Sequence, residues 1–467
     1  MHIRVGLQHI IIVSSGQISR EMLDHRAKFY SDRPPSKVGE ILARNMRSVL
    51  MPYGEDLKRI RKTYYKYISA SKCDGYLRIQ EGESIATCHD LLTDQHRFME
   101  KISRYSMSVA RSFTFGRRMP SCDDQYAKDI KDLMDHFSEV MLPGKFLVDT
   151  FPFLMHLPRP LKPWMRKIEE FRDWETEFIL RQYRNAQQDV KQHPSRPSVA
   201  RDFADDLTES GDRQELQAAT TCMEILGVGF DTTANSILAF VQACIAYPET
   251  VIKAHEELDR VIGRDRYPTW DDEPNLPYIR AMIKEQQRWR SIAPMSNDLD
   301  PFCRFSHFAS KEDVVDGYRI PKGSIVRINT WAMHMDPERY PDPENYRPER
   351  FLNHELPAAT YAASNDVAAR DHFSYGNGRR ICLGIHVAER SLFLMCSRLL
   401  HTFDILPALD SDGKPIPVDT SKYFSGLISG PESYQARFVL RSKEAGALLD
   451  KDWKGYFGGG PVESWYD

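Results

Sequence analysis

The start of the chain alternates apolar and polar residues, whereas most of the later chain repeats apolar residues at helical spacing. Residues 3–7 alternate and residues 10–13 are all apolar, a pattern that predicts a β-hairpin. Ser15 is of a type that caps helices, and apolar positions at helical spacing continue from it to about Tyr30. This first part of the chain therefore predicts a hairpin followed by one helix.

Helical spacing of apolar residues dominates the rest of the chain. It predicts a basic helix over residues 55–67 and helices throughout residues 83–190, with breaks at prolines. The longest pattern, residues 212–247, is ended by Pro248 and would measure roughly 50 Å at about 1.5 Å per residue. A helix of that length would cross the whole molecule.

Strand-like segments return only late in the chain. Residues 313–334 have a strand–turn–strand pattern, and residues 423–428 and 434–440 flank the turn sequence SGPES, which predicts a second hairpin. No internal repeat or clear domain boundary interrupts this order. We therefore expect a mainly α protein with a small β-rich lobe.

Composition and charge place the chain among globular proteins and remove several function classes. Of 467 residues, 41% are hydrophobic and the formal net charge is -3, so no global attraction to nucleic acid is implied. The eight cysteines form no CxxC pair, which favours a reducing compartment over a disulfide framework or a zinc site. The hydrolase motifs HExxH and GxSxG and a phosphate-binding P-loop are also absent.

The amino-terminal segment predicts no membrane anchor. Its longest apolar run is residues 10–13, whereas a membrane-spanning helix needs about 20 apolar residues, and we expect no stretch of this chain to provide them. A signal peptide would begin with basic residues and end at a small-residue cleavage site, and neither is present. We therefore expect a protein that is cytosolic or only peripherally attached to a membrane.

The candidate chemistry centres on one cysteine in the stretch FSYGNGRRICLG, which precedes another helical pattern. Cys382 stands just before that helix, where free backbone N–H groups and the positive end of the helix dipole stabilise a thiolate. Gly376 and Gly384 lack a Cβ atom and let the backbone approach a flat group closely. Arg380 offers a cation to a carboxylate on that group, and Phe373 is expected to shield the sulfur from water. This combination suits an axial ligand to haem iron.

The spacing Phe-x-x-Gly-x-Gly-x-Arg-x-Cys-x-Gly resembles the haem-binding loop of the cytochrome P450 family in every fixed position. The resemblance extends from the first hairpin to about residue 442. It is closest to fungal members of secondary metabolism that use a separate reductase. It implies a helical triangular prism with a small β-rich lobe. We expect residues 1–467 to form a single catalytic domain that lacks the family's usual amino-terminal membrane anchor and hinge.

The centre of the longest predicted helix, GVGFDTT, contains two glycines, each of which weakens a helix by about 1 kcal/mol. Such a weakness is tolerated where another group lies against the backbone, and the Thr232 hydroxyl can bond back to the carbonyl of Val228. A kinked helix in the core would show the same pattern. The segment also resembles the family's oxygen-binding groove, with Val228 and Gly229 in its two small positions. The resemblance implies that Asp231 and Thr232 relay protons during dioxygen activation, and that Val228 narrows the substrate pocket.

Glu285 and Arg288 lie three residues apart on one face of a predicted helix, where they can pair. An exposed ion pair would have this spacing too. In the family, such a pair joins a second arginine, here Arg350 in PDPENYRPERF, in a buried network ahead of the haem loop. The resemblance implies that the three residues clamp the segment that carries this loop.

Further haem contacts follow from the resemblance alone. Arg61, in the basic helix, matches an arginine that binds a haem carboxylate, whereas Leu57 replaces the tryptophan that usually binds one as well. His307 matches a haem-contacting histidine. The remaining cations of the basic helix are expected to steer an acidic redox partner.

The resemblance also places the substrate. The pocket is expected to include Pro294, Phe424 and Leu427. Between Pro294 and His307 the chain has about eight residues more than the family pattern, an excess that a loop tolerates. We expect residues 295–302 to form this insertion, close to the iron.

The resemblance implies a haem-thiolate monooxygenase that inserts one atom of dioxygen into a lipophilic small molecule, in secondary-metabolite biosynthesis. Its cofactor would be haem b held by Cys382, with electrons from NADPH through a flavoprotein reductase. We expect a monomer without nucleic-acid partners, and the family's usual location is the cytosolic face of the endoplasmic reticulum. Three alternatives stay open. A haem-thiolate isomerase or dehydratase would need no acid–alcohol pair, an electron-transfer haem protein would need no substrate cavity, and a truncated family member would be catalytically impaired.

Overall fold

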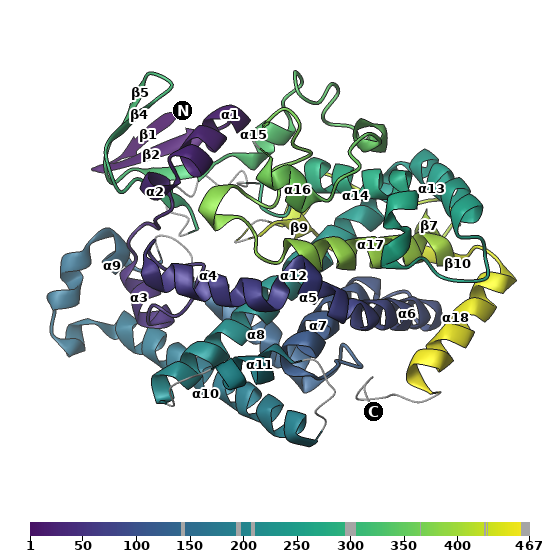
Figure 1. The fold of residues 1–467 in the computed structure, drawn as a ribbon, viewed down its shortest axis with the longest axis horizontal. Coiled ribbons are helices and arrows are strands. Elements are labelled where there is room, and N and C mark those ends of the chain that lie inside the picture. Colours follow the sequence, from purple (N-terminus) through teal and green to yellow (C-terminus); the bar gives the residue numbers. More distant parts are fainter. Residues whose placement is uncertain are drawn as a thin grey trace.

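The computed structural model describes residues 1–141, 145–192, 198–206, 211–294, 305–364, 366–424, 426 and 428–458. Helices form most of this part of the chain (Figure 1). The α-helices are α1 (Gly16–Arg20), α2 (Ala27–Tyr30), α3 (Lys37–Ala43), α4 (Glu55–Ile68), α5 (Ala70–Cys73), α6 (Leu77–Thr93), α7 (Phe98–Phe115), α8 (Gln125–Met141), α9 (Leu147–Thr150), α10 (Pro163–Gln192), α11 (Val199–Asp206), α12 (Asp212–Ala246), α13 (Pro248–Val261), α14 (Pro277–Trp289), α15 (Thr330–His334), α16 (Ala358–Ala363), α17 (Ile385–Thr402) and α18 (Lys443–Phe457). The strands are β1 (His2–Val5), β2 (Gln8–Val13), β3 (His307–Phe308), β4 (Asp313–Val315), β5 (Tyr318–Ile320), β6 (Ile325–Ile328), β7 (Phe403–Pro407), β8 (Tyr423–Phe424), β9 (Gly430–Pro431) and β10 (Ala436–Leu440).

The β-rich lobe is built around the amino-terminal hairpin. β1 and β2 pair antiparallel with Ile3 opposite Ile10, so the predicted hairpin is confirmed. β2 also pairs parallel with β6, and β6 pairs antiparallel with β3, which gives the sheet order β1-β2-β6-β3. Ile10, Ile12 and Ile325 form a buried cluster on this sheet. Ile11 and Val13, on the opposite face of β2, are buried in a second cluster, so the apolar run of β2 is buried on both faces.

The helix predicted after the hairpin is present but interrupted. Ser15 caps α1, because its hydroxyl accepts a hydrogen bond from the N–H of Ile18 at 3.4 Å. A π-helical turn, η1 (Glu21–His25), then separates α1 from α2. Met22 and Leu23 of this turn are buried. They pack in the same hydrophobic cluster as Phe373, so the turn meets the cysteine loop directly.

The helix α12 runs from Asp212 to Ala246, as predicted, and lies in the middle of the helical part (Figure 1). It packs against α7, α10 and α17, among other elements. Within the described residues it is the one helix that is long and apolar enough to cross a membrane, which corrects the expectation that no stretch has this composition. However, 78% of its most apolar window is buried inside the protein. The apolar residues of α12 therefore serve the core.

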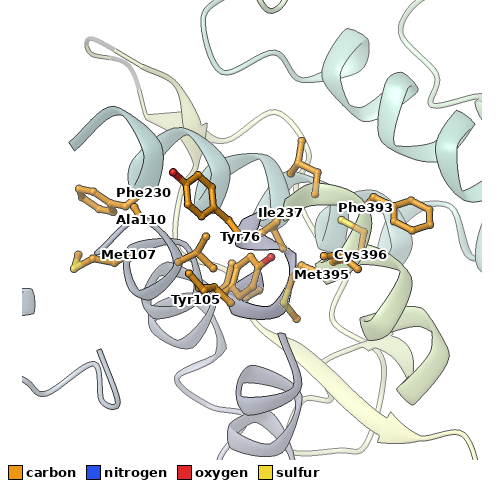
Figure 2. Packing of buried hydrophobic residues seen from close by; sticks show 14 of the residues in the cluster. Tyr76, Tyr105, Met107, Ala110, Phe230, Ile237, Phe393, Met395 and Cys396 are labelled. Atoms are coloured by element: carbon orange, nitrogen blue, oxygen red, sulfur yellow. The ribbon is translucent and has the colours of Figure 1, made fainter. Parts of the chain in front are cut away.

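The largest hydrophobic cluster joins α6, α7, α12 and α17 (Figure 2). Tyr105 of α7, Ile237 of α12 and Phe393 of α17 are all buried in it. Burying a side chain of this size stabilises the fold by about 1.5–3 kcal/mol. This packing fixes α12 relative to α17, and hence the centre of α12 relative to the cysteine loop that precedes α17.

The predicted pairing of residues 423–428 with residues 434–440 is wrong. β8 pairs with β9, whereas β10 pairs antiparallel with β7, the strand that follows α17. Phe438 of β10 meets Phe403 of β7 edge to face, with ring centroids 5.8 Å apart. An earlier strand, β7, therefore takes the place of the neighbouring segment, and this diagonal aromatic contact stabilises the pairing.

A carboxy-terminal helix, α18, follows β10 and was not predicted from the sequence. It packs along α6 (Figure 1). The rings of His89 and Trp453 stack with centroids 4.5 Å apart, and Phe457 is buried against Ala86. The helical part of the molecule thus extends beyond the last strand.

Candidate functional site

A cavity of about 330 Å³ lies between the centre of α12 and the loop that precedes α17. Its wall combines side chains of α4, α7, α12 and α17 with Ile292, Ala293 and Ile428. Cys382 and Thr232 both line it, so the two motifs found in the sequence face one space. A mostly apolar space with a few polar groups is the usual form of a small-molecule site.

Cys382 lies between the 3₁₀ turn η7 (Gly378–Arg380) and α17, in the cavity wall. Its N–H donates to the carbonyl of Tyr375 at 2.9 Å, which closes the loop around the sulfur. Burial raises the pKa of the Cys382 thiol, while the N–H of Gly384 and the guanidinium of Arg61 oppose this rise. The protein alone therefore favours the thiol, and a bound metal would convert it to the thiolate.

The groups around Cys382 fit haem better than a metal held by protein ligands alone. Within the part of the chain that the structure describes, no group of three or more His, Cys, Asp and Glu side chains could hold a metal ion. A metal on Cys382 would therefore have to bring its other ligands with it. Haem would do so, because the porphyrin would supply four nitrogen ligands and Cys382 would supply the thiolate.

Three arginines, Arg33, Arg61 and Arg380, line the same cavity. Burial together with the neighbouring guanidiniums of Arg33 and Arg61 lowers the pKa of Arg380 to about 9. Arg61 donates to the carbonyl of Ile381 at 2.8 Å. Neither Arg61 nor Arg380 pairs with a carboxylate among the described residues. A cavity ligand that carries carboxylates would relieve this crowding of positive charge, and haem carries two.

The guanidinium of Arg380 keeps donors for such a ligand. It donates to the carbonyls of Ser31, Ser48 and Met51 at 2.9, 3.0 and 2.6 Å, respectively. A guanidinium has five N–H groups, so two remain after these three bonds. The residues present therefore fit haem at both ends, with a thiol for the iron and cations for the carboxylates.

The glycines of the loop differ in what they permit. Gly376 has a φ of +73°, a left-handed conformation that favours glycine, and a Cβ atom there would meet nothing within 4 Å. At Gly378, with φ +62°, a Cβ atom would lie 1.9 Å from the carbonyl oxygen of Leu23 in η1. A Cβ atom at Gly384 would lie 3.9 Å from Sγ of Cys382. Gly384 is thus the glycine that adjoins the sulfur, whereas Gly378 is required by the packing of η1.

Phe373 and His307 lie beside the cavity and are not part of its wall. Phe373 is buried, and its N–H donates to Nε2 of His334 at 2.8 Å. His307 of β3 donates from Nδ1 to the carbonyl of Tyr30 at 2.8 Å. Burial, with Arg33 nearby, lowers the pKa of His307 to about 3, so its ring is neutral. The shielding of the sulfur by Phe373 and the haem contact of His307 stay predictions.

The centre of α12 stays helical and presents Val228 and Thr232 to the cavity. Oγ1 of Thr232 donates to the carbonyl of Val228 at 2.7 Å, the bond that the sequence predicts. Val228 is 49% exposed on a helix that is otherwise mostly buried, because its side chain faces this space. The valine therefore narrows the cavity where the family pattern has a smaller residue.

The two glycines beside Val228 give room to neighbouring helices. A Cβ atom at Gly227 would lie 3.1 Å from the sulfur of Met134 in α8. A Cβ atom at Gly229 would lie 3.5 Å from Cβ of Ala110 in α7, and Gly229 also lines the cavity. The absence of side chains at Gly227 and Gly229 thus permits close packing of α8 and α7 against α12.

Asp231 does not line the cavity, unlike its neighbour Thr232. Burial raises the pKa of Asp231 to about 6; Asp135 of α8 adds to the rise, and Asn235 opposes it. Nδ2 of Asn235 donates to the carbonyl and to Oδ1 of Asp231, at 2.8 and 3.1 Å. A carboxyl with this pKa exchanges its proton readily near neutral pH. Asp231 and Thr232 therefore face different sides of α12, with the hydroxyl of Thr232 in the cavity and the carboxyl of Asp231 beside α8.

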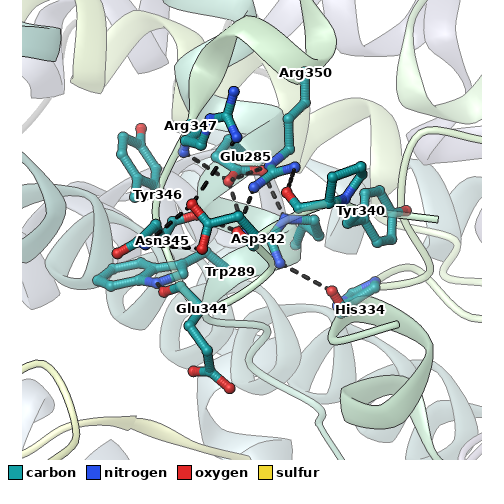
Figure 3. A network of polar contacts seen from close by, with 12 residues as sticks. Glu285, Trp289, His334, Tyr340, Asp342, Glu344, Asn345, Tyr346, Arg347 and Arg350 are labelled. Atoms are coloured by element: carbon teal, nitrogen blue, oxygen red, sulfur yellow. Dashed lines mark hydrogen bonds and ion pairs between the residues drawn. The ribbon is translucent and has the colours of Figure 1, made fainter. Parts of the chain in front are cut away.

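Glu285, Arg288 and Arg350 form the buried network that the sequence predicts (Figure 3). Arg288 donates from Nε and Nη2 to the two carboxylate oxygens of Glu285 at 2.7 and 2.8 Å, and Arg350 donates from Nε at 3.3 Å. The side chains of Glu285 and Arg288 are both 0% exposed. Arg288 also donates to the carbonyl of His334 at 2.9 Å, and the imidazole of His334 accepts from the N–H of Phe373. The network thus reaches the cysteine loop.

The cavity wall near the predicted substrate contacts consists of residues one to a few positions away from them. Pro294 and Phe424 are not part of the cavity wall, whereas Ala293 and Ile428 are. Leu427 and residues 295–302, the expected insertion, lie outside the described residues. The β8–β9 segment therefore reaches the cavity through Ile428.

Arg33 and Glu224 also line the cavity and were missed by the sequence reasoning. Arg33 stands in the stretch SDRPP, which predicts only a loop. Glu224 precedes Thr232 by two turns of α12, and it is 8% exposed. The sequence did contain a signal for Glu224, because it is a charged residue in an apolar helical pattern and lies one to two turns before Val228 and Thr232.

Known proteins resemble this chain over almost its whole length. It matches the cytochrome P450 family over residues 1–438. It is 32% identical to cytochrome P450 monooxygenase verL of Clonostachys rogersoniana, over 96% of this chain and 82% of that protein. It is 37% identical to cytochrome P450 monooxygenase atE of Aspergillus terreus, over 93% of this chain and 80% of that protein.

Solved structures agree with the architecture. Two zebra fish cytochrome P450 structures, one with abiraterone and one with progesterone, match with TM-scores of 0.72 and 0.73 at 21% and 20% identity. The matches cover 95% and 94% of this chain, and 96% of each of those chains. The predicted fold, mainly α with a small β-rich lobe, is confirmed.

Proposed function

Because the chain belongs to the cytochrome P450 family, we propose that Cys382 is the axial thiolate ligand of its haem iron. The chain is a haem-thiolate monooxygenase, the class that its curated relatives share. The observation that supports Cys382 is its position in the wall of a mostly apolar cavity that also contains three arginines. A thiol so placed, with cations on the same cavity, suits an iron held in a carboxylate-bearing porphyrin.

The protein's own residues prepare this site. When bound, haem supplies the activation of dioxygen. Arg33, Arg61 and Arg380 bind its carboxylates, and the N–H of Gly384 stabilises the sulfur. Oγ1 of Thr232 passes protons into the cavity, and the carboxyl of Asp231 renews them from the side of α8. The apolar wall excludes other water.

The substrate is a lipophilic small molecule, because the cavity offers mainly apolar contacts. Val228 limits its size next to Thr232. The curated relatives come from fungi, and we infer a role in fungal secondary-metabolite biosynthesis. The alternatives are not favoured: an isomerase or dehydratase needs no Asp–Thr pair, and an electron-transfer protein needs no such cavity.

Electrons reach family members from NADPH through a reductase, and we propose a flavoprotein reductase as the partner of a monomeric protein. Arg59, Lys62 and Lys66 of α4 are exposed and suit an acidic partner surface. Family members are generally associated with the endoplasmic reticulum membrane, and we propose peripheral attachment at its cytosolic face. Residues 1–467 form one catalytic domain in this proposal, since a single hydrophobic cluster includes residues from α4 to α18.

The Cys382→Ala variant tests the haem ligand. The reduced wild-type protein with carbon monoxide should show the red-shifted Soret band of thiolate-ligated haem, and the variant should lose it. Cys122→Ala is the matched control, because Cys122 is a free cysteine away from the cavity, and it should keep the band. A Cys382→Ala protein that retains the band would contradict the assignment.

A further inference from the structure

The segment between α3 and α4 contributes Ser48 and Val49 to the cavity wall. We term residues 46–51 the wall segment. It has no helix or strand of its own, so no regular backbone ladder holds it in place. Backbone bonds within residues 43–51 satisfy the N–H groups of Met46, Leu50 and Met51, and the remaining backbone groups need partners from other elements.

Three carbonyl groups of the wall segment accept hydrogen bonds from arginines of the cavity. Arg380 donates to the carbonyls of Ser48 and Met51, and Arg33 donates to the carbonyl of Val49 at 2.9 Å. These are two of the arginines that we assign to the haem carboxylates. The wall segment and haem therefore share hydrogen-bond donors.

The N–H groups of Ser48 and Val49 in the wall segment donate to Glu224 of α12. Its Oε2 accepts from the N–H of Ser48 at 3.0 Å, and its Oε1 accepts from the N–H of Val49 at 2.9 Å and from the hydroxyl of Ser48 at 3.0 Å. Tyr64 of α4 donates from its hydroxyl to Oε2. Four donors fill the acceptor positions of a carboxylate.

This full set of bonds decides what Glu224 does. A carboxylate in a cavity wall could bind a hydrogen-bond donor of the substrate, but here no acceptor position is left for one. The same helix also holds the wall segment at a second point, where Nε2 of Gln217 donates to the carbonyl of Met46 at 2.9 Å. The contacts of Glu224 are therefore those of a clamp between α12 and the wall.

We propose that Glu224 is a positioning residue that fixes the wall segment against α12, and that it thereby sets the size of ligand that the cavity admits. The inference rests on the proposed function in taking this cavity as the haem and substrate site. Val228 and the wall segment then border the same space, one from the helix and one from the loop. A released wall admits larger ligands, while the haem ligand Cys382 is untouched.

Glu224→Gln is the variant that tests this proposal most directly. The amide keeps the shape of the side chain, but its NH₂ group replaces one acceptor and faces N–H or O–H donors. At least one hydrogen bond to the wall segment is lost, which leaves a buried donor unsatisfied. In the haem-loaded protein, we expect amide hydrogen exchange in a peptide spanning the wall segment to become about tenfold faster.

Two matched controls distinguish the loss of hydrogen bonds between Glu224 and the wall segment from a general destabilisation of the protein. Tyr64→Phe removes a bond to the same carboxylate but none to the wall segment, so exchange there should stay near that of the wild type. Glu215→Gln changes a glutamate of the same helix that pairs with Arg184 at the surface, and it should also have no effect. Ser48→Ala removes one bond from the wall side, and it should accelerate exchange less than Glu224→Gln.

Azole binding, followed by the Soret shift, is the second measurement. Imidazole is small, so it should bind Glu224→Gln and the wild type at rates within about twofold of each other. The larger 4-phenylimidazole should bind Glu224→Gln about tenfold faster than it binds the wild type. Wild-type exchange and wild-type azole rates in Glu224→Gln would overturn the proposal. If that variant does not fold, Ser48→Ala decides by the same two measurements. Failure of the haem assignment is separate, because it would show as a missing thiolate band in the wild-type protein.

Discussion

Removing the carboxylate of Glu285 should destabilise the protein and weaken its hold on haem. Glu285 accepts hydrogen bonds from Arg288, from Arg350 and from the N–H of Arg347. In Glu285→Ala, the guanidinium of Arg288 stays fully buried without its counter-charge. Another bond of Arg288, to the carbonyl of His334, is part of the link to the N–H of Phe373, so the disturbance reaches the loop of Cys382.

The size of the effect follows from burial. Breaking a buried charge pair by removing one partner costs about 3–5 kcal/mol. The entropy of unfolding is about 2.1 cal/mol/K per residue, or about 1 kcal/mol/K for 467 residues. The expected fall in the melting temperature is therefore about 3–5 °C.

Thermal unfolding followed by circular dichroism, together with the haem content per protein, measures this prediction. Glu312→Ala is the control, because it breaks the pair of Glu312 with Arg319, whose side chains are 53% and 73% exposed. An exposed pair contributes at most about 1 kcal/mol, so this variant should melt within about 1 °C of the wild type. A Glu285→Ala protein with the melting temperature and haem content of the wild type would show that the network is not buried in solution.

Two further predictions concern the centre of α12. Thr232→Ala removes the hydroxyl from the cavity but leaves Cys382 in place, so the carbon monoxide spectrum should be unchanged. A larger share of NADPH electrons should be recovered as hydrogen peroxide, because the hydroxyl no longer passes protons. An unchanged share would contradict this role of Thr232. For Asp231, burial raises the pKa from 3.8 to about 6, so the folded state favours the protonated acid and stability falls as the pH rises through this interval. Asp231→Asn should therefore melt higher than the wild type above about pH 6 but not below about pH 4, and a pH-independent difference would contradict the buried carboxyl.

The parts of the site that could be predicted are those whose chemistry lies in a short stretch of sequence. The cysteine loop and the centre of α12 each contain their functional groups within about one dozen residues, and local spacing sets their geometry. The bond from Thr232 to the carbonyl of Val228 is of this kind, because it joins residues one helical turn apart. The network of Glu285 was predictable for the same reason in its Glu–Arg half, while Arg350 came from the family resemblance.

The remaining parts depend on contacts that no local pattern contains. Glu224 and Ser48 are 176 residues apart in the chain, and only tertiary packing brings the carboxylate to the N–H group. The pairing of β10 with β7 was not predicted for a similar reason. The turn between residues 428 and 434 gives a strong local signal for a hairpin, whereas the true partner strand, with Phe403, lies about 30 residues earlier. The packing role of Gly378 was likewise hidden, since the carbonyl of Leu23 that excludes a side chain belongs to η1, more than 350 residues earlier in the chain.

The helix α8 connects the wall segment with the proton-carrying side of α12. The guanidinium of Arg47 lies 4.4 Å from the ring centre of Phe137 in α8, and it pairs with the buried Glu175 of α10. One turn away, Met134 packs on Gly227, and the charge of Asp135 adds to the rise in the pKa of Asp231 that burial causes. A displacement of α8 would therefore change the cavity wall and the environment of the acid together. Because Glu224 bonds the wall to α12 directly, it limits how far these two sides of the site can move apart.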